Sequence, residues 1–396
     1  MAQVSVIGGG LGGLVAAITA AERGATVELF EAHAELGGRW RITDPPFAFH
    51  EGPHVVYADG PVYPWLRRRG LLGSPRSVPL SALRRFGFRY QGRRRRVPPL
   101  TLLRVVIARQ APVDTSFADW ATARFGPEVA GHSAAAAGVG LFHPRPGDLS
   151  AAFVHERLRR VFALPPQAGY REGGWGRLMT DLAGYARTLG VSIETGARIT
   201  ARPDGPTIVA TSLPAARVLL ADDSLTWPSG QVGLLDLSLR RAPADAFVVS
   251  DLDEGGWLED FAVPDPTLAP AGCSAVQIQL PLVEGEDRSE TVARLERLAD
   301  LGLPGWLDRV VHRRDGVARG RTGAVDYPGT TWRDRPAVER GDALFLVGDQ
   351  VAAPGLLSEV SFTSGVRAGR LAAGCSSKGD DPLGPQQPGV SRMNWR

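Results

Sequence analysis

The sequence predicts an α/β protein in which a nucleotide-binding domain with a parallel sheet carries an inserted α+β domain. The first observation is a strand, a glycine-rich turn, a helix and a second strand, all within residues 4–31. The second is a strand over residues 343–347 that runs directly into a Gly-Asp pair. The third is the loss of this pattern between residues 61 and 166, where arginine-rich and helical segments follow. At 396 residues the chain is too long for one core of typical size, so two domains are expected.

The N-terminal pattern is a complete βαβ unit. Residues 4–7 form the short apolar run that is typical of a buried parallel strand, and residues 14–21 predict a helix with small residues on its packing face. Gly24 ends this helix, and residues 26–31 predict the second strand. This arrangement is typical of domains that bind a dinucleotide.

The turn between the first strand and the helix has the spacing G-x-G-x-x-G. The first glycine allows the tight turn, the second lets the backbone approach a pyrophosphate, and the third lets helix and strand pack closely. The start of the helix adds unpaired N–H groups and the positive end of a dipole. The predicted phosphate-binding residues are Gly8, Gly10, Leu11, Gly12 and Gly13.

Glu31 ends the second strand, where its carboxylate can accept hydrogen bonds from both hydroxyls of an adenosine ribose. Its charge would repel a 2′-phosphate, so NADP is disfavoured. The adjacent Ala32 is included in the predicted site. A glycine-rich turn alone is weak evidence in a chain with 48 glycines, but the strands, helix and acid all fall in their expected places.

A second glycine turn, Gly37-Gly38, follows the acid and is followed at once by Arg39. An arginine at this point can neutralise a pyrophosphate through charge-assisted hydrogen bonds, so Gly38 and Arg39 join the predicted site. The order of glycine turn, acid and G-G-R resembles the flavin amine oxidase superfamily, which includes monoamine oxidases, protoporphyrinogen oxidase and phytoene desaturases. The resemblance implies FAD as the cofactor and a Rossmann-type, GR2-like FAD-binding domain.

The resemblance extends to the C-terminal part of the chain, where the strand over residues 343–347 is followed by Gly348 and Asp349. In the superfamily such a strand places the aspartate on the ribityl hydroxyls. The following helix, predicted over residues 364–369, then directs its N-terminus at the flavin pyrimidine, where its dipole stabilises negative charge. Three further cofactor contacts are implied at Glu359, at Val360 and, through its backbone to the adenine, at Ile199.

In the resembling families a segment with glycine and proline after an acid returns the chain to the isoalloxazine ring, and Gly52 and Pro53 match this pattern. His54 and Glu51 are therefore predicted to lie at the flavin face as acid–base residues, with His54 also a cofactor contact. A loop histidine that only hydrogen-bonds backbone is an equally weighted interpretation of His54.

The scarcity of lysine in this sequence narrows the range of reactions that the resemblance implies. Monoamine and polyamine oxidases carry a lysine that holds a water at flavin N5, whereas the single lysine of this sequence is Lys378, near its end. This departure favours dehydrogenation or desaturation of a small, apolar or conjugated biosynthetic substrate, with O2 or another oxidant as electron acceptor. An amine or amino-acid oxidase without the lysine is one alternative. A flavin isomerase without net redox chemistry, or a non-catalytic flavin binder, is another.

The two expected domains are interleaved along the chain. The ranges assigned to the FAD-binding domain are 1–60, 167–232 and 335–375; those of the substrate domain are 61–166 and 233–334; and residues 376–396 are expected to form a flexible tail. Helices are expected over 117–124, 128–137, 151–162, 178–190, 214–220 and 289–301, and strands over 191–194, 196–200, 207–211, 233–239, 247–249 and 275–280.

Arginines alternate with aromatic residues over 86–93, and a run of four arginines begins at Arg93. Such interleaving can indicate nucleic acid binding, but the net charge is only +3 and no nucleic-acid-binding fold is evident, so no such partner is expected. The alternation favours a solvated hairpin that turns at Gln91-Gly92. An apolar helix over residues 100–110 follows, for which a buried core helix is favoured. The alternative is weak docking of this region on an anionic membrane surface.

The two cysteines, Cys273 and Cys375, lie too far apart in sequence to indicate a disulfide scaffold or a metal site. The sequence enters its first strand directly, which leaves no room for a signal peptide, and the early apolar helix is too short to span a bilayer. The expected location is therefore the cytoplasm.

Overall fold

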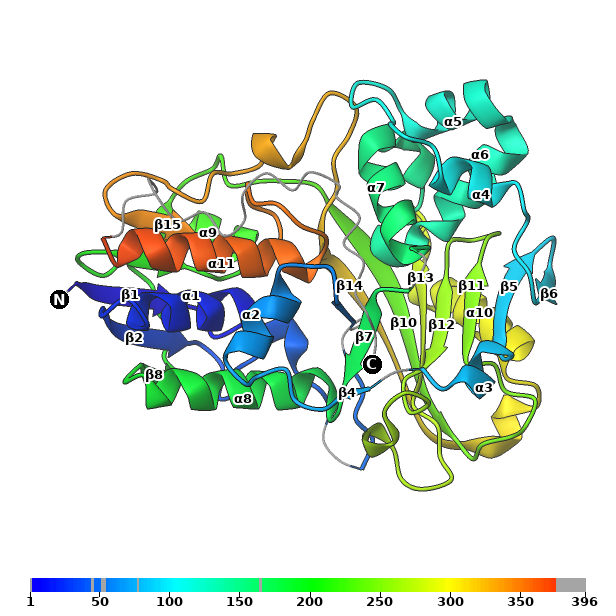
Figure 1. Ribbon diagram of the computed structural model, residues 1–396, viewed down its shortest axis with the longest axis horizontal. Coiled ribbons are helices and arrows are strands. Elements are labelled where there is room, and N and C mark those ends of the chain that lie inside the picture. Colours follow the sequence, from blue (N-terminus) through cyan, green and yellow to red (C-terminus); the bar gives the residue numbers. More distant parts are fainter. Residues whose placement is uncertain (1, 44–45, 51–54, 77, 164–165, 375–396) are drawn as a thin grey trace.

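The computed structural model of the protein describes residues 2–43, 46–50, 55–76, 78–163 and 166–374. Two large sheets lie side by side, with helices on their outer faces, and a small sheet lies between them (Figure 1). The strand order is β15-β9-β1-β2-β8 in the first sheet, β14-β10-β13-β12-β11-β5-β6 in the second, and β3-β7-β4 in the small sheet. The predicted α/β class is confirmed.

The strands of the described residues are β1 (Gln3–Ile7), β2 (Thr26–Glu31), β3 (Val56–Tyr57), β4 (Pro75–Arg76), β5 (Phe86–Tyr90), β6 (Arg93–Arg95), β7 (Ala168–Arg171), β8 (Ser192–Thr195), β9 (Thr207–Val209), β10 (Ser229–Leu239), β11 (Val248–Asp251), β12 (Trp257–Asp260), β13 (Val276–Pro281), β14 (Val310–Ala324) and β15 (Leu344–Leu346). The α-helices are α1 (Leu11–Ala21), α2 (Val62–Arg68), α3 (Leu80–Leu83), α4 (Leu102–Val106), α5 (Phe117–Phe125), α6 (Pro127–Ala136), α7 (Ala151–Val161), α8 (Gly174–Thr188), α9 (Leu213–Leu220), α10 (Arg288–Gly302) and α11 (Ser358–Ala372).

The first sheet is parallel throughout, and α1, α8 and α11 lie along it (Figure 1). Helices α1 and α11 approach so closely that glycine is required between them. A Cβ atom on Gly365 would lie 2.6 Å from the carbonyl oxygen of Gly12, and one on Gly369 would overlap that of Ala16. The first and the last helix of the described residues are therefore held together by backbone-to-backbone packing.

The second sheet packs one face against α10. Leu235 and Leu237 of β10 and Val276 and Ile278 of β13 form a buried apolar cluster with helix residues that include Leu295. Because side chains alternate along a strand, the neighbouring residues on β10 and β13 point to the opposite face. That opposite face carries the polar residues described below.

Two strands of this sheet, β12 and β14, were not predicted from the sequence. The sequence of β14 is rich in arginine and glycine, and within the described residues this strand pairs only with β10. Such an edge strand buries little of its own side-chain surface, so it lacks the apolar alternation by which strands are recognised.

The strand predicted over residues 196–200 is wrong. Gly196 adopts φ +72°, and its N–H donates to the carbonyl of His33 at 2.8 Å. The N–H of Ala197 donates to the carbonyl of Glu31 at 2.9 Å. The left-handed glycine ends β8, and the chain then runs past the end of β2 without forming a ladder.

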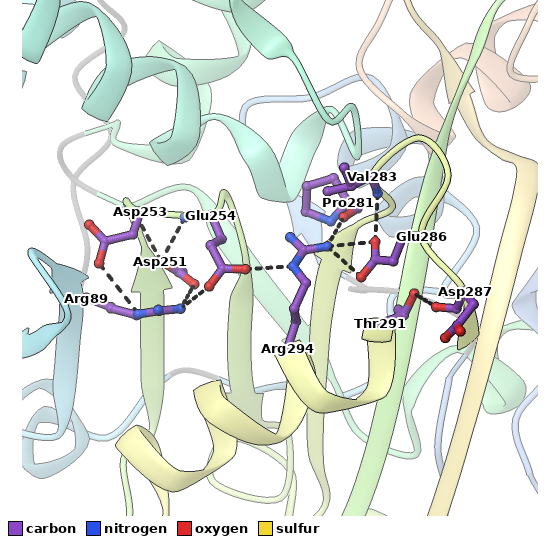
Figure 2. Close-up of polar contacts among 10 residues, drawn as sticks. All are labelled: Arg89, Asp251, Asp253, Glu254, Pro281, Val283, Glu286, Asp287, Thr291 and Arg294. Carbon is purple, nitrogen blue, oxygen red and sulfur yellow. Dashed lines mark hydrogen bonds and ion pairs between the residues drawn. The ribbon is translucent and has the colours of Figure 1, made fainter. Parts of the chain in front are cut away.

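The arginine-rich hairpin is only partly solvated. The predicted turn is confirmed, with Gln91 and Gly92 at φ +54° and +70°. However, β5 joins the second sheet through β11, and the guanidinium of Arg89 donates to Asp251 and Glu254 at 2.9 Å each (Figure 2). Glu254 also accepts from Arg294 of α10 at 2.7 Å, so a chain of alternating charges ties the hairpin to the sheet and helix.

The apolar helix expected over residues 100–110 is reduced to α4, and it is buried on one face only. Leu102 and Val105 are fully buried, whereas Leu100 and Ile107 are 71% and 75% exposed. The buried-core interpretation therefore holds for half of this segment. Throughout the described part of the chain, every helix is too short or too polar to cross a bilayer.

Candidate cofactor and substrate site

Three glycines of the first turn, Gly8, Gly12 and Gly13, are required by backbone geometry or by packing. Gly8 adopts φ +112°, a conformation that favours glycine, and its N–H donates to the carbonyl of Phe30 at 2.7 Å. A Cβ on Gly13 would overlap the carbonyl oxygen of Gly8. Gly12, which follows Leu11 at the start of α1, packs against the end of β15: its Cβ would lie 2.5 Å from a side-chain methyl of Val347.

Gly10 differs from these because neither conformation nor packing requires it to be glycine. Its φ of −79° suits any residue, and a Cβ there would have only the carbonyl oxygen of Gly37 within range, at 4.0 Å. The space before Gly10 opens at the N-terminus of α1, where free N–H groups and the helix dipole attract an anion. This cradle fits a pyrophosphate that approaches the backbone closely.

The second glycine turn lies against the first. The N–H of Gly37 donates to the carbonyl of Gly9 at 2.9 Å, and Gly38 adopts φ +55° beside the Cα of Gly10. This turn leads into a short 3₁₀ helix, Gly38–Trp40. Arg39 is thereby directed at Asp349, which follows β15 and Gly348, and the two side chains form an ion pair.

The carboxylate of Asp349 is held in its ionised form. Burial alone would raise its pKa, but the charge and hydrogen bond of Arg39 outweigh burial and lower the pKa below its usual value. The predicted residues Arg39 and Asp349 are thus brought together at the carboxyl edge of the parallel sheet, where ligands of such sheets bind.

Glu31 is buried at the end of β2 and is also ionised. Its carboxylate accepts hydrogen bonds from the backbone N–H of Gly9 at 2.8 Å and of His33 at 2.9 Å. Burial would raise its pKa, but these bonds together with the His33 side chain lower it. Each carboxylate oxygen can accept more than one hydrogen bond, so Glu31 retains capacity for a ribose hydroxyl.

The predicted contacts Ala32 and Ile199 lie away from the Arg39–Asp349 pair. Ala32 follows β2 and is partly buried. Ile199 packs against the core of the parallel sheet and lines a surface hollow together with Glu28 and Phe30 of β2. Their contact with an adenine stays a prediction.

A cavity lies between the Arg39–Asp349 pair and the second sheet. Besides this pair, its nearer wall holds Ser358 and Glu359 at the N-terminus of α11. Its farther wall is formed by three strands of the second sheet, through Val232 of β10, Gln279 of β13 and Thr322 of β14. The remaining lining is largely apolar and includes Val55, Val56, Val62, Phe142, Trp175 and Leu356.

Glu359 is buried and paired within the protein. It accepts from the N–H of Leu356 at 3.0 Å and from the guanidinium of Arg160 at 2.9 Å. Burial raises its pKa although Arg160 opposes this. Arg160 also lies over the ring of Tyr57, whose pKa burial raises to about 12. Glu359 therefore fixes the loop before α11, and Val360 packs its side chain into the core beside α1.

Sequence reasoning missed Arg160, and no local signal could have found it. It lies in the last turn of α7, where basic residues are common, and its partner is 199 positions away. Gln279 was also missed. Here a signal existed, because Gln277 and Gln279 interrupt a strand that is otherwise apolar.

The predicted residues Glu51, Gly52, Pro53 and His54 lie outside the described residues. Val55, the residue that follows them in the sequence, lines the cavity. On the other side, the Nε2 atom of the buried His50 accepts a hydrogen bond from the N–H of Trp175, at the start of α8, at 3.2 Å. Burial, assisted by the nearby charge of Arg314, lowers the pKa of His50 to about 3. His50 is therefore a neutral anchor for this segment.

Comparison with known proteins agrees with this geometry. Residues 6–68 match the family of NAD(P)-binding Rossmann-like domains. No curated protein sequence matches the chain. Among solved structures, an oxidoreductase from Methanosarcina mazei is 17% identical with a TM-score of 0.72, over 92% of this chain and 99% of that one.

Two further structures represent different activities. A reduced UDP-galactopyranose mutase is 14% identical with a TM-score of 0.70, over 96% of this chain and 97% of that one. Cyclohexylamine oxidase from Brevibacterium oxydans IH-35A is 16% identical with a TM-score of 0.68, over 94% of this chain and 98% of that one. The chain thus contains an NAD(P)-binding Rossmann-like domain over residues 6–68, and its overall fold is similar to that of these three enzymes.

Proposed function

We propose that the protein is an FAD-dependent oxidoreductase that removes hydride from a small molecule bound in the cavity. The observation that carries this proposal is the composition of the cavity's two walls. Arg39 and Asp349, which fit a flavin dinucleotide, form one wall, and Val232 and Gln279 of the second sheet form the other. A substrate held against the second sheet is thereby held against the cofactor as well.

The residues present fit FAD. The cradle at Gly10 would take the pyrophosphate, Arg39 would neutralise it, Asp349 would accept from the ribityl hydroxyls, and Glu31 would accept from the adenosine ribose. When bound, FAD supplies a hydride acceptor at N5. The N-terminus of α11, beside Ser358, would direct the positive end of its helix dipole at the pyrimidine end of the flavin.

The lining supports an apolar or conjugated substrate body. Val56, Phe142, Val232 and Leu356 offer no charge and no hydrogen-bonding side-chain group, so this part of the lining suits an apolar substrate from which hydride leaves carbon. Among the described residues no lysine lines this cavity, and the single lysine of the sequence is Lys378. We therefore place dehydrogenation or desaturation of a biosynthetic intermediate before oxidation of an amine.

The alternatives differ in what the bound flavin does. In anaerobic mixing with candidate substrates, bleaching of the flavin band at about 450 nm identifies hydride transfer, and ammonia in the products identifies an amine substrate. Turnover without bleaching or oxygen uptake indicates an isomerase, a class represented among the similar folds by the mutase. Hydrogen peroxide formed on readmission of air identifies O2 as the electron acceptor.

We further propose Glu51 and His54 as the acid–base residues. The support is that Val55, the next residue, lines the cavity. Glu51→Gln and His54→Gln are expected to slow anaerobic reduction of the bound flavin, measured on protein saturated with FAD because His54 is also a predicted cofactor contact. A rate of reduction that neither substitution alters would contradict this role.

The exposed side chains on and beside α4, within residues 96–107, support a second proposal, weak docking on anionic lipid. Val97, Leu100 and Ile107 are 59%, 71% and 75% exposed, and Arg96 and Arg104 are exposed beside them. Apolar side chains flanked by cations suit a membrane surface, where the former enter the interface and the latter meet lipid phosphates.

A further inference from the structure

The cavity-facing side of the second sheet carries a row of buried polar side chains. Gln277 and Gln279 of β13, and Asp236 opposite Gln277 on β10, are each only 1% exposed. Burial of such groups costs free energy unless each polar atom is hydrogen-bonded. The hydrogen bonds of this row therefore determine how its side chains are oriented.

The side-chain amides of the row are oriented by hydrogen bonds at the end that holds Asp236. The carboxylate of Asp236 accepts from Nε of Arg314 at 2.7 Å and from Nε2 of Gln277 at 2.8 Å. Nε2 of Gln277 also donates to the carbonyl oxygen of His50. Because this carbonyl can only accept, the amide nitrogen of Gln277 must face this end, and its oxygen must face Gln279.

The orientation of the Gln277 amide determines that of the Gln279 amide, which lines the cavity. Oε1 of Gln277 accepts from Nε2 of Gln279 at 2.8 Å, which fixes the second amide in turn. Oε1 of Gln279 is left without a hydrogen-bond partner among the described residues, although the residue lines the cavity and is buried. Oγ1 of Thr322, on the same wall, is likewise buried and unpartnered within the described part of the chain.

We propose that Gln279 determines substrate specificity: its fixed carbonyl oxygen accepts a hydrogen bond from an N–H or O–H group of the substrate. The substrate class is then an apolar or conjugated body that bears an amine, amide, alcohol or phenol group. This inference rests on the proposed function, since it takes the cavity as the substrate site. The N–H of the flavin ring is the other source of such a donor.

The expected preference for ligands that carry a hydrogen-bond donor can be given as a ratio of affinities. A buried acceptor left unpaired costs about 1–3 kcal/mol, so an analogue that lacks the donor should bind roughly 5–150-fold more weakly. Gln279→Met keeps the length of the side chain and removes the acceptor, so it should abolish this preference. Gln279→Glu keeps an acceptor, and in the protonated form that burial favours, its hydroxyl can donate to Oε1 of Gln277 as the amide does, so it should retain the preference. Gln231→Met is the matched control, because Gln231 lies on β10 of the same sheet but is exposed.

The probes are pairs that differ by one donor: indole with 1-methylindole, and phenol with anisole. Their dissociation constants are measured by calorimetry on the FAD-loaded protein, together with the dissociation constant of FAD for each variant. We expect the wild type, Gln279→Glu and Gln231→Met to prefer indole and phenol at least fivefold. Gln279→Met should show no preference, and FAD affinity should be equal in all four.

Three results would overturn the inference: no preference in the wild type, an undiminished preference in Gln279→Met, or a loss of FAD affinity in Gln279→Met. The last would assign the donor to the flavin ring. Failure of the proposed function looks different. A protein that binds the probes with this preference, but whose flavin no substrate reduces, contradicts the oxidoreductase proposal and leaves the assignment of Gln279 standing.

Discussion

The guanidinium of Arg39 donates a hydrogen bond to the carboxylate of Asp349, although the two residues lie 310 positions apart in the chain. Arg39 is brought there by the second glycine turn, and Asp349 by the strand β15. The second glycine turn and the end of β15 both lie at the carboxyl edge of one parallel sheet, so the pair joins two distant segments of the chain at the edge where ligands of such sheets bind.

Replacement of Arg39 by alanine should weaken FAD binding by about 10–100-fold, because one charge-assisted interaction with a phosphate is lost and Asp349 is left buried without its cation. The FAD affinity of Arg39→Lys should lie between those of the wild type and Arg39→Ala, because lysine keeps the positive charge but lacks the planar guanidinium group. Fluorescence titration of the apoprotein with FAD measures the change. Arg69→Ala, which removes an ion pair with Glu22 just after the end of α1, is the control. Equal affinity in Arg39→Ala and the wild type would refute the role of Arg39.

The two glycines Gly10 and Gly13 should respond oppositely to alanine. Gly10→Ala should fold normally but lose FAD affinity tenfold or more, about 1.4 kcal/mol, because its methyl group fills the cradle. Gly13→Ala should lower the free energy of unfolding by about 1–3 kcal/mol, because its methyl group overlaps the carbonyl of Gly8. Urea unfolding and FAD titration of both variants test the contrast. A Gly10→Ala protein that binds FAD as the wild type does would place the pyrophosphate elsewhere.

His50 should make the protein less stable in acid. Its folded-state pKa of about 3 lies below the ordinary 6.5, so between these values the unfolded chain binds a proton at His50 and the folded protein does not. Stability from neutral His50 is thus complete above about pH 6.5 and falls by about 1.4 kcal/mol per pH unit towards pH 3.

His50→Gln can still accept from the N–H of Trp175 through its amide oxygen, but it cannot titrate. Urea unfolding at pH 7.5 and at pH 5.5, both about one pH unit from the ordinary histidine pKa, gives the comparison. The loss of stability between them should be about 1.4 kcal/mol larger in the wild type than in His50→Gln. Identical losses would show that burial does not hold His50 neutral.

The exposed face around α4 should bind anionic vesicles at low salt. Sedimentation with vesicles of phosphatidylserine and phosphatidylcholine measures this, and the double variant Leu100→Ser/Ile107→Ser should bind less because two exposed apolar side chains are lost. Val218→Ser, at a residue 82% exposed on α9, is the matched control. If the wild type stays in the supernatant at low salt, this face has no affinity for lipid.

The sequence predicts those parts of the fold whose signals are local. The spacing of Gly8, Gly10 and Gly13 encodes a turn, a cradle and a helix–strand contact within six residues, so the βαβ unit is recognisable without knowledge of its neighbours. The Gly348-Asp349 pair is recognisable for the same reason, since a strand delivers it directly.

The remaining features depend on partners far away in the chain. The local sequence around Arg89 predicts a solvated hairpin, whereas its side chain binds Asp251, 162 positions later. The acceptor at Gln279 depends on Asp236 and His50, which fix the amide of Gln277 from another strand and another loop. The apolar helix over residues 100–110 was expected in the core because local sequence does not reveal which of its faces has a neighbour.

The measurement that tests the central claim most directly is the flavin content of the purified protein, with and without added FAD. The account predicts a yellow protein that holds one FAD per chain, and an apoprotein that regains the colour and this ratio when FAD is supplied. A folded protein that remains colourless and takes up no FAD would contradict it.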